Sequence, residues 1–119
     1  MTDDRKAGRD SIRAHLALYI GGMGSREKNY YNQLWRSYGY EEEAARIQDL
    51  YLDRKKDEAM AAISDEMVDL TTIIGPVEEC RERLEALSRV GVNEVSIGLS
   101  VPGNDPMETL AALQALAPQ

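Results

Sequence analysis

A short glycine-rich run, Gly21-Gly22-Met23-Gly24-Ser25, is the first candidate for chemistry in this sequence. Glycine lets backbone N–H groups approach an anion, and a helix that begins at Ser25 would favour a phosphate. The run matches neither the Gly-x-Gly-x-x-Gly motif nor a Walker loop, and it follows a helix where those motifs follow a strand. Two interpretations stay open: a tight bend that ends a helix, or a loop that lines a site together with Asn29.

One imidazole and one thiol are the other reactive groups. No Cys, Asp or Glu lies at metal-ligand spacing from His15, so we expect a packed or half-exposed helix residue there. Acidic neighbours do not activate a thiol, so we expect Cys80 to be a small core residue. No acid, base and nucleophile can be assembled from the sequence. It therefore predicts no catalytic residue and no metal site.

Aromatic side chains crowd into one stretch, which contains Tyr30, Tyr31, Trp35 and Tyr38. Such a stripe is typical of packing between helices, but it could also stack on a planar ring system.

Composition restricts the class of protein. The chain has 119 residues and a formal charge of −7. A negative field repels a phosphate backbone, so nucleic acid is not an expected partner. The single cysteine favours a reducing compartment. No apolar run reaches about 18 residues and the N-terminus is charged, so we expect a cytoplasmic protein without a membrane span or signal peptide.

Helices must position most of these residues. Asp3 and Asp4 can cap a first helix that ends at Gly21, and Ser25 can cap a second that stops at Gly39. Further helices are predicted over residues 41–53, 57–63, 65–72, 76–90 and 105–117.

The segment over residues 65–72 is ambiguous between helix and strand, whereas the one over residues 76–90 is not. β-Branched residues near Thr71 favour a strand, but the acidic start after Ser64 favours a helix there. Pro76 at the first helical position and Gly91 after the last mark the clearest helix.

From Val92 the pattern changes to a period of two. Apolar residues alternate with polar or small ones up to Val101, which predicts a strand over residues 92–101 with one apolar face. A lone strand leaves its backbone groups unpaired, and helices on both sides are typical of a parallel sheet. We therefore expect an α/β fold. Its other strands would come from an absent N-terminal portion, a second copy of the chain or another subunit.

Several motifs together resemble the C-terminal third of luciferase-like oxidoreductases. The run Leu16–Ser25 is followed by Asn29-Tyr30-Tyr31 and Gly39-Tyr40, and later motifs keep the family's order: Ile47-Gln48-Asp49-Leu50-Tyr51-Leu52, Glu58-Ala59, Asp65-Glu66-Met67-Val68-Asp69, Ile74-Gly75-Pro76 and Gly91-Val92. The resemblance covers essentially the whole chain and is greatest to the branch that uses the deazaflavin coenzyme F420. One departure is the turn Asp53-Arg54-Lys55, where the family usually carries a glycine.

The resemblance implies an eight-stranded parallel (β/α)8 barrel of the TIM type, which needs about 250 residues in full. Residues 1–119 would be the C-terminal part of that single domain, mostly helical with one strand. Residues 1–74 would form the helical region after the seventh strand, and residues 75–119 the last helix-strand-helix unit. The chain would then be a fragment of the barrel.

The implied function is hydride transfer between coenzyme F420, or alternatively FMN, and a small organic substrate, with the isolated chain inactive. Barrel enzymes place functional groups after their strands, so Asn104 is a candidate or else part of a turn. The expected cofactor-binding residues are Gly21, Gly22, Met23, Gly24, Asn29, Gly98 and Ser100.

A non-enzymatic alternative also fits the sequence. A helical module could hold a protein partner through its acidic surface and aromatic cluster, or dimerise through the strand edge.

Overall fold

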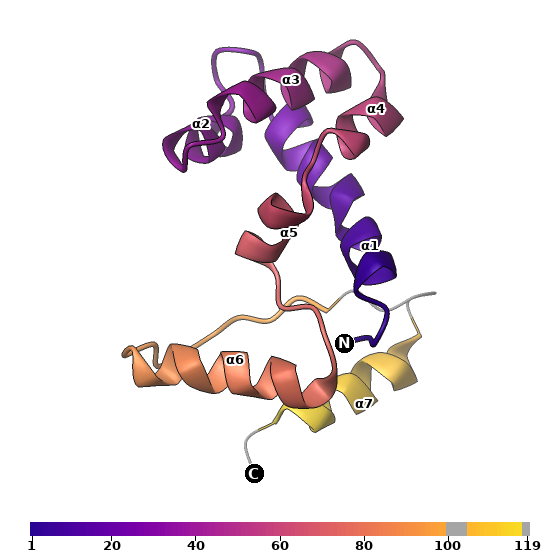
Figure 1. Cartoon of the computed structure of the whole chain (residues 1–119), viewed down its shortest axis with the longest axis vertical. Helices are drawn as coiled ribbons and strands as arrows, with labels where there is room; N and C mark the ends of the chain where they lie inside the picture. Colours follow the sequence, from indigo (N-terminus) through magenta and orange to yellow (C-terminus); the bar gives the residue numbers. More distant parts are fainter. Residues whose placement is uncertain (100–104, 118–119) are drawn as a thin grey trace. The chain divides into compact units, whose positions relative to one another are not determined.

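The computed structural model describes residues 1–99 and 105–117 of the chain. It divides into two compact units (Figure 1). The central unit is Arg9–Thr72, and the terminal unit combines Met1–Gly8 with Ile73–Gln119. The boundary between the units falls within the first helix.

The central unit is a cluster of short helices. It contains most of α1 (Arg5–Ala17), the π-helical turn η1 (Leu18–Gly22), α2 (Tyr30–Ser37), α3 (Glu41–Leu52), α4 (Lys56–Ala61) and α5 (Asp65–Thr71). Turn η1 and α2 both pack against α3. Burial of apolar surface drives this packing, and the core side chains come from every element: Leu16, Ala17, Ile20, Trp35, Ala44, Ile47, Ala59, Ile63, Met67 and Val68.

Two helix boundaries differ from the sequence prediction. The first helix does not run on to Gly21 as an α-helix, because its last turn from Leu18 to Gly22 is π-helical. The second helix begins at Tyr30, and its N-cap is Asn29, not Ser25. The prediction of a cap at Asp4 is confirmed, since its Oδ1 accepts from the N–H of Ala7 at 3.0 Å.

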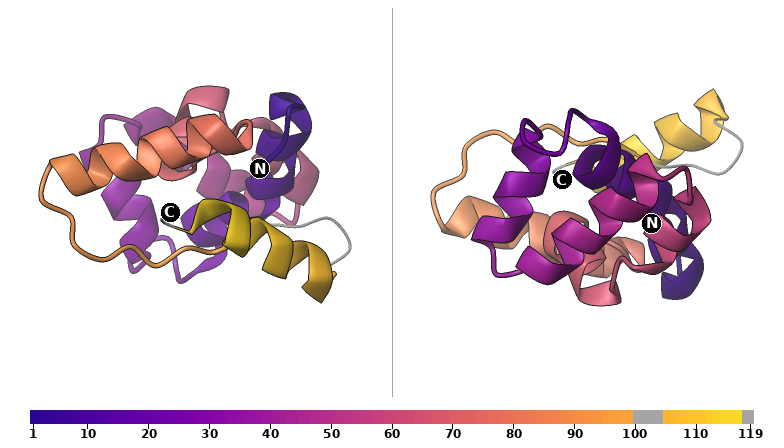
Figure 2. Two further views of the ribbon diagram at one scale, coloured as in Figure 1. Left: turned by 90° about the horizontal axis from the view of Figure 1, so that it is seen from below. Right: turned by 90° about the horizontal axis from the view of Figure 1, so that it is seen from above.

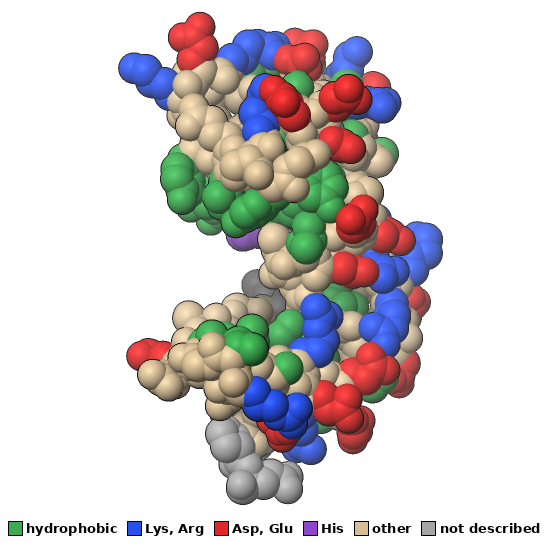
Figure 3. Space-filling model, turned by 60° about the vertical axis from the view of Figure 1, so that its left-hand side comes forward, with side chains coloured by type: hydrophobic (Ala, Val, Ile, Leu, Met, Phe, Trp, Pro, Cys, Tyr) green, Lys and Arg blue, Asp and Glu red, His purple; other side chains and the backbone are tan. Residues whose placement is uncertain are grey.

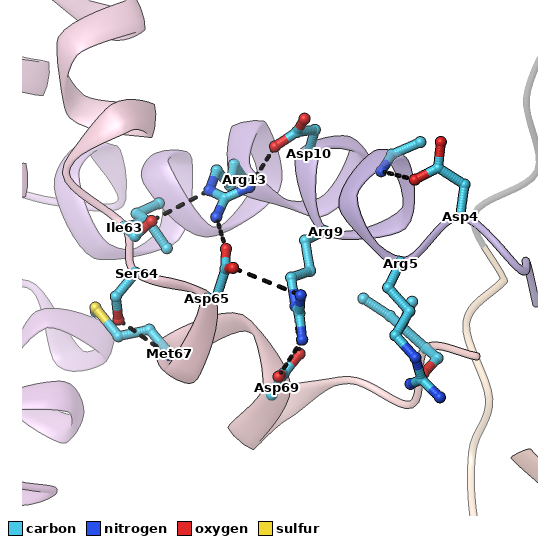
Figure 4. A network of polar contacts seen from close by, with 12 residues as sticks. Asp4, Arg5, Arg9, Asp10, Arg13, Ile63, Ser64, Asp65, Met67 and Asp69 are labelled. Carbon is cyan, nitrogen blue, oxygen red and sulfur yellow. Dashed lines mark hydrogen bonds and ion pairs between the residues drawn. The ribbon is translucent and has the colours of Figure 1, made fainter. Parts of the chain in front are cut away.

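An ion-pair network joins α1 to α5 (Figure 4). Arg9 bonds to Asp69 through two nitrogens, and Arg13 pairs with Asp65 and Asp10. The Nε atom of Arg13 also donates to the carbonyl of Ile63 at 3.1 Å, just before α5. The two arginines thereby fix the short helix α5 along the side of α1.

The turns that follow α2 and α3 use left-handed backbone. Gly39 follows α2 with a φ of 96°, as predicted for the residue that ends this helix. Arg54 follows α3 with a φ of 64°. Among the described residues, it is the only one other than glycine that has a positive φ. The departure at Asp53-Arg54-Lys55 therefore leaves the turn in place, but with an arginine in a conformation that costs about 1 kcal/mol or more outside glycine.

The terminal unit contains the first residues of α1 together with α6 (Val77–Arg89) and α7 (Pro106–Leu116). Arg5 donates to the carbonyl of Ile74 at 2.8 Å and pairs with Glu79. Asp105 caps α7 by accepting from the N–H of Met107 at 2.8 Å, so the predicted cap is confirmed. Gly91 ends α6 with a φ of 93°, also as predicted.

The predicted strand over residues 92–101 is wrong for the part that the structure describes. Residues 92–99 have no regular secondary structure (Figure 2), and Ser100 and Val101 lie outside the described residues. Alternation decides which side chains share a face, but a strand also requires a neighbour that pairs with its N–H and C=O groups. The described residues supply no such neighbour, and all their regular elements are helical.

Candidate functional site

Three glycines, two at the end of η1 and one in the loop between η1 and α2, allow close packing of the backbone. A Cβ atom on Gly21 would lie 2.5 Å from Cβ of Tyr51, and one on Gly22 would overlap the Tyr51 ring. Gly24 has a φ of 143°, and a Cβ atom there would overlap the carbonyl oxygen of Lys28. The loop therefore lies against α3 at its start and against its own far end.

Two buried asparagines hold the base of this loop. Nδ2 of Asn29 donates to the carbonyls of Tyr19 at 3.2 Å and Ile20 at 3.0 Å, and its Oδ1 accepts from the N–H of Asn32 at 3.0 Å. Nδ2 of Asn32 donates to the carbonyls of Ile20 at 2.9 Å and Ala44 at 2.8 Å. The amides thus satisfy the carbonyls of Tyr19 and Ile20 at the C-terminal end of η1, where a helix leaves carbonyls without an intrahelical partner. Asn32 also ties η1 to α3 through the carbonyl of Ala44.

This arrangement defines the contribution of Asn29. Its side chain is only 1% exposed, and its donor and acceptor atoms are already used within the chain. Asn29 therefore positions the loop. The sequence reasoning missed Asn32, which completes the clamp and also accepts from Nε of Arg36 at 2.8 Å. The signal that could have found it is the Asn-x-x-Asn spacing, which places two amides on one side of a helix start.

The tip of the loop presents a methionine to solvent. Met23 is 44% exposed and follows η1 directly. Arg26 pairs with Asp49 on α3, and its Nη2 lies 3.8 Å from Oδ1 of Asp53. Exposed pairs of this kind contribute little stability, so the loop owes its position mainly to the asparagine clamp.

A row of aromatic rings lies next to the loop. The ring centroids of His15 and Tyr19 are 4.5 Å apart, those of Tyr19 and Tyr31 are 4.7 Å apart, and those of Tyr31 and Tyr30 are 5.5 Å apart. The last two pairs are edge-to-face, a favourable geometry for aromatic rings. Tyr30 is 68% exposed. Figure 3 shows hydrophobic side chains gathered on one face of the central unit.

A second aromatic group lies at the C-terminal end of α2 and just after it, and it is a packing group. Trp35 is buried and meets Tyr38 and Tyr40 edge-to-face, with centroids 5.9 Å and 5.5 Å away. Burial raises the pKa of Tyr40, and the hydrogen bond and charge of Glu66 raise it further. The tyrosine hydroxyl therefore stays a neutral donor toward the carboxylate of Glu66 over the ordinary pH range.

The expected site residues fall into separate groups. Gly21, Gly22, Met23, Gly24 and Asn29 come together at the loop of the central unit. Gly98 belongs to the terminal unit, where it is exposed and a Cβ atom would meet no described atom within 4 Å. Ser100 and Asn104 lie outside the described residues.

The two reactive groups occupy ordinary positions. His15 is exposed and stacks on Tyr19. Cys80 is buried, as expected, and its Sγ lies 3.4 Å from the carbonyl oxygen of Gly75. Among the described residues, no three His, Cys, Asp or Glu side chains gather as metal ligands would.

The loop does not form a complete cofactor site from the described residues. The space beside Gly21 and Gly22 is filled by Tyr51, and the space beside Gly24 by Lys28. The buried side-chain nitrogen without a partner among the described residues is Nε2 of Gln48, which belongs to α3 and not to the loop. Met23 is the expected loop residue with an exposed large side chain.

Comparison with known proteins assigns the family. The model of the luciferase-like monooxygenase family matches residues 1–94. The chain belongs to the luciferase-like monooxygenase family. Membership of this family implies a TIM-barrel fold, and the described residues contribute only helices to it.

One curated relative adds detail to this membership. The chain is 34% identical over 113 residues to a Mycobacterium tuberculosis (strain ATCC 25618 / H37Rv) protein that is provisionally named a coenzyme F420-dependent oxidoreductase. The match covers 95% of this luciferase-like chain but 32% of the relative, so the chain spans about a third of the relative's length. No solved structure matches the chain. Within the described residues, no helix is both long and apolar enough to cross a membrane.

Proposed function

We propose that this chain is the C-terminal portion of a coenzyme F420-dependent luciferase-like oxidoreductase. The complete enzyme would transfer hydride between the deazaflavin and a small organic substrate. The observation that supports this proposal is the 34% identity, over 95% of the chain, to a protein named for dependence on coenzyme F420. Residues 1–74 would follow the seventh barrel strand, and residues 75–119 would complete the barrel.

The short length supports an incomplete site. A whole barrel of this type needs about 250 residues, and the match leaves about two-thirds of the relative without a counterpart. When bound, F420 supplies the hydride chemistry, and the protein supplies binding and orientation. The walls of the pocket that this chain lacks would come from the rest of the barrel.

The residues that we propose to face the cofactor pocket are those at the tip of the loop, namely Met23 with the backbone of Gly22 and Gly24. Met23 is exposed in this chain and has the soft, adaptable side chain that suits a variable surface. Gly21 and Asn29 would act from beneath by fixing the loop. Gly98 and Ser100 would belong to the barrel mouth of the terminal unit.

A fluorescence titration tests this function. The uncovered two-thirds of the mycobacterial relative is fused ahead of this chain, and the fusion is titrated with oxidised F420 and with FMN. We expect saturable binding of F420 by the fusion, weaker binding of FMN, and no saturable binding by the chain alone. Micromolar binding by the chain alone would show that its site is complete. A folded fusion that binds neither cofactor would remove the proposed function.

The non-enzymatic module is not favoured, because the family match extends over both units of the chain.

A further inference from the structure

The ring of Tyr51 on α3 lies directly against the last residue of η1. A Cβ atom on Gly22 would lie 2.4 Å from Cε1 of Tyr51, 3.0 Å from Cδ1 and 3.1 Å from Cζ. Because these ring atoms lie so close to one point, the glycine backbone rests on the ring with no room for a side chain between them. Met23 follows Gly22 directly and is 44% exposed. The ring therefore supports the backbone one residue before the loop tip.

The ring itself is held in place at two points. A Cβ atom on Gly21 would lie 2.5 Å from Cβ of Tyr51, so α3 approaches η1 closely where the side chain begins. Helix α4 begins at Lys56, and its Nζ atom lies 5.5 Å from the centroid of the Tyr51 ring. A cation over an aromatic face is attracted by the ring. Both the start and the face of the Tyr51 side chain are thus restrained.

The other contacts of the loop act on either side of its tip. The asparagine clamp holds η1 through the carbonyl of Ile20, and the ion pair with Asp49 holds the loop again at Arg26. The tip at Met23 lies between these two points of attachment. In that interval, the close approach of the backbone to α3 is made at the Tyr51 side chain.

We propose that Tyr51 is a positioning residue for the cofactor pocket. Its ring would hold Gly22 so that Met23 is presented to the deazaflavin in one conformation, and Tyr51 would act through Met23 without touching the cofactor. A loop that is ordered before binding loses less conformational entropy when it binds. Loss of the ring should therefore weaken cofactor binding. The identity of the pocket rests on the proposed function.

NMR relaxation of the complete chain tests the positioning without any cofactor. Tyr51→Ala removes the ring but keeps Cβ, whereas Tyr51→Phe keeps the ring. We expect order parameters of about 0.85 for the amides of residues 22–24 in the wild type and in Tyr51→Phe, and values below about 0.6 in Tyr51→Ala. The matched control is Val68→Ala, which shortens a fully buried side chain on α5 and should leave these amides rigid.

Folding of each variant is checked separately. Trp35 is the single tryptophan and is buried in the central unit, so its emission reports that this unit is folded. If Tyr51→Ala does not fold, Tyr51→Leu takes its place, because leucine fills part of the volume but has no flat ring to support Gly22.

Titration of the fusion protein with oxidised F420 tests the consequence for the pocket. The Kd for F420 should rise at least about fivefold in Tyr51→Ala, because a smaller fraction of the loop is in the binding conformation. It should stay within about twofold of the wild type in Tyr51→Phe and in Val68→Ala, although Val68→Ala also lowers the melting temperature. Met23→Ala should weaken binding less in the Tyr51→Ala background than in the wild type, since both changes act on the same contact.

Four results would overturn the positioning role: wild-type order parameters in Tyr51→Ala, equal loss of order in Tyr51→Phe, equal rises of the Kd in Tyr51→Ala and Val68→Ala, or additive losses for Tyr51 and Met23. The two levels of the inference fail separately. A folded fusion that binds no F420 would remove the proposed function, and with it the cofactor part of this inference, but the order parameters would still decide whether Tyr51 holds the loop. Wild-type order parameters in Tyr51→Ala would remove the role of Tyr51 even if the fusion binds F420.

Discussion

Arg9 on α1 and Asp69 on α5 form a two-point ion pair. Nε of Arg9 lies 2.9 Å from Oδ1 of Asp69, and Nη2 lies 2.7 Å from Oδ2. The hydrogen bond with Asp69 raises the pKa of Arg9, so the pair is charged at any ordinary pH. Parallel bonds of this kind fix an angle as well as a distance. The pair therefore orients α5, a helix of 7 residues that would be marginal alone.

Replacing Arg9 with glutamine should destabilise the chain by about 1 kcal/mol, because a half-buried bidentate pair contributes more than an exposed one. Urea unfolding followed by circular dichroism gives the free energy. The matched control is Arg89→Gln, which breaks the exposed 3.3 Å pair with Glu85 on α6. It should change the free energy by less than about 0.5 kcal/mol. Equal losses in both variants would mean that the Arg9 pair does not hold α5.

Replacing Asn32 with alanine should cost about 2–3 kcal/mol, because it leaves the buried carbonyls of Ile20 and Ala44 each without one hydrogen bond. The neighbouring Gln33→Ala is the control, since the Gln33 side chain is exposed and makes a single 3.4 Å bond to Glu27. Chemical denaturation compares the two. A loss below about 1 kcal/mol for the Asn32 variant would contradict the clamp on the loop.

These two interactions mark the limit of what the sequence could predict. Capping residues act on their own neighbours, so Asp4, Asp105 and the helix that ends at Gly91 could be read locally. The pairs Arg9–Asp69 and Asn32–Ile20 join different helical elements. The Asn-x-x-Asn spacing marks Asn32, but neither it nor any other local pattern says which carbonyl or carboxylate the side chain meets.

The predictions of a helix cap at Ser25 and of a strand from residue 92 were wrong for related reasons. Ser25 has the right residue type for an N-cap, but Asn29 is the N-cap of α2, and its amide also donates to the carbonyls of η1. Residues 92–99 alternate as a strand does, yet strand formation depends on pairing partners that alternation does not provide. The loop residues of the candidate site could be found from their glycines, but their packing against Tyr51 could not.

Replacing Arg54 with glycine should stabilise the chain by about 0.5–1 kcal/mol. Arg54 has a φ of 64°, where glycine is free of the strain that a Cβ atom causes. The gain is reduced by the larger entropy of glycine in the unfolded state. Arg54→Ala removes the same charge but keeps Cβ, so it should not reproduce the gain. Thermal unfolding compares the melting temperatures of the two variants. Equal melting temperatures would mean that any gain in stability comes from loss of the charge and not from relief of backbone strain.

Stability should fall at alkaline pH through Tyr40. Its folded-state pKa is raised, first by burial and then by Glu66, so its contribution is complete below the unfolded pKa of about 10 and is lost as pH rises through the folded-state pKa. Urea unfolding from about pH 8 to about pH 11 measures this loss. Tyr40→Phe should flatten the fall, whereas Tyr38→Phe, at an exposed ring, should keep the wild-type slope. Parallel curves for all three proteins would exclude Tyr40 as the cause.

Alanine at Gly21 or Gly22 should cost about 1–3 kcal/mol through overpacking, whereas Gly98→Ala should change stability by less than about 0.5 kcal/mol. The reason differs between the first two sites. A Cβ atom at Gly22 meets the ring of Tyr51, but one at Gly21 meets Cβ of Tyr51 and, at 3.2 Å, the carbonyl oxygen of Ile47. In a Tyr51→Ala background, which removes the ring and keeps Cβ, the Gly22 change should therefore become nearly neutral and the Gly21 change should stay costly. Denaturant unfolding of this double-mutant cycle separates the two cases. If the Gly22 change stayed fully costly without the Tyr51 ring, the glycine would be required for backbone conformation and not for the close approach of the loop to α3.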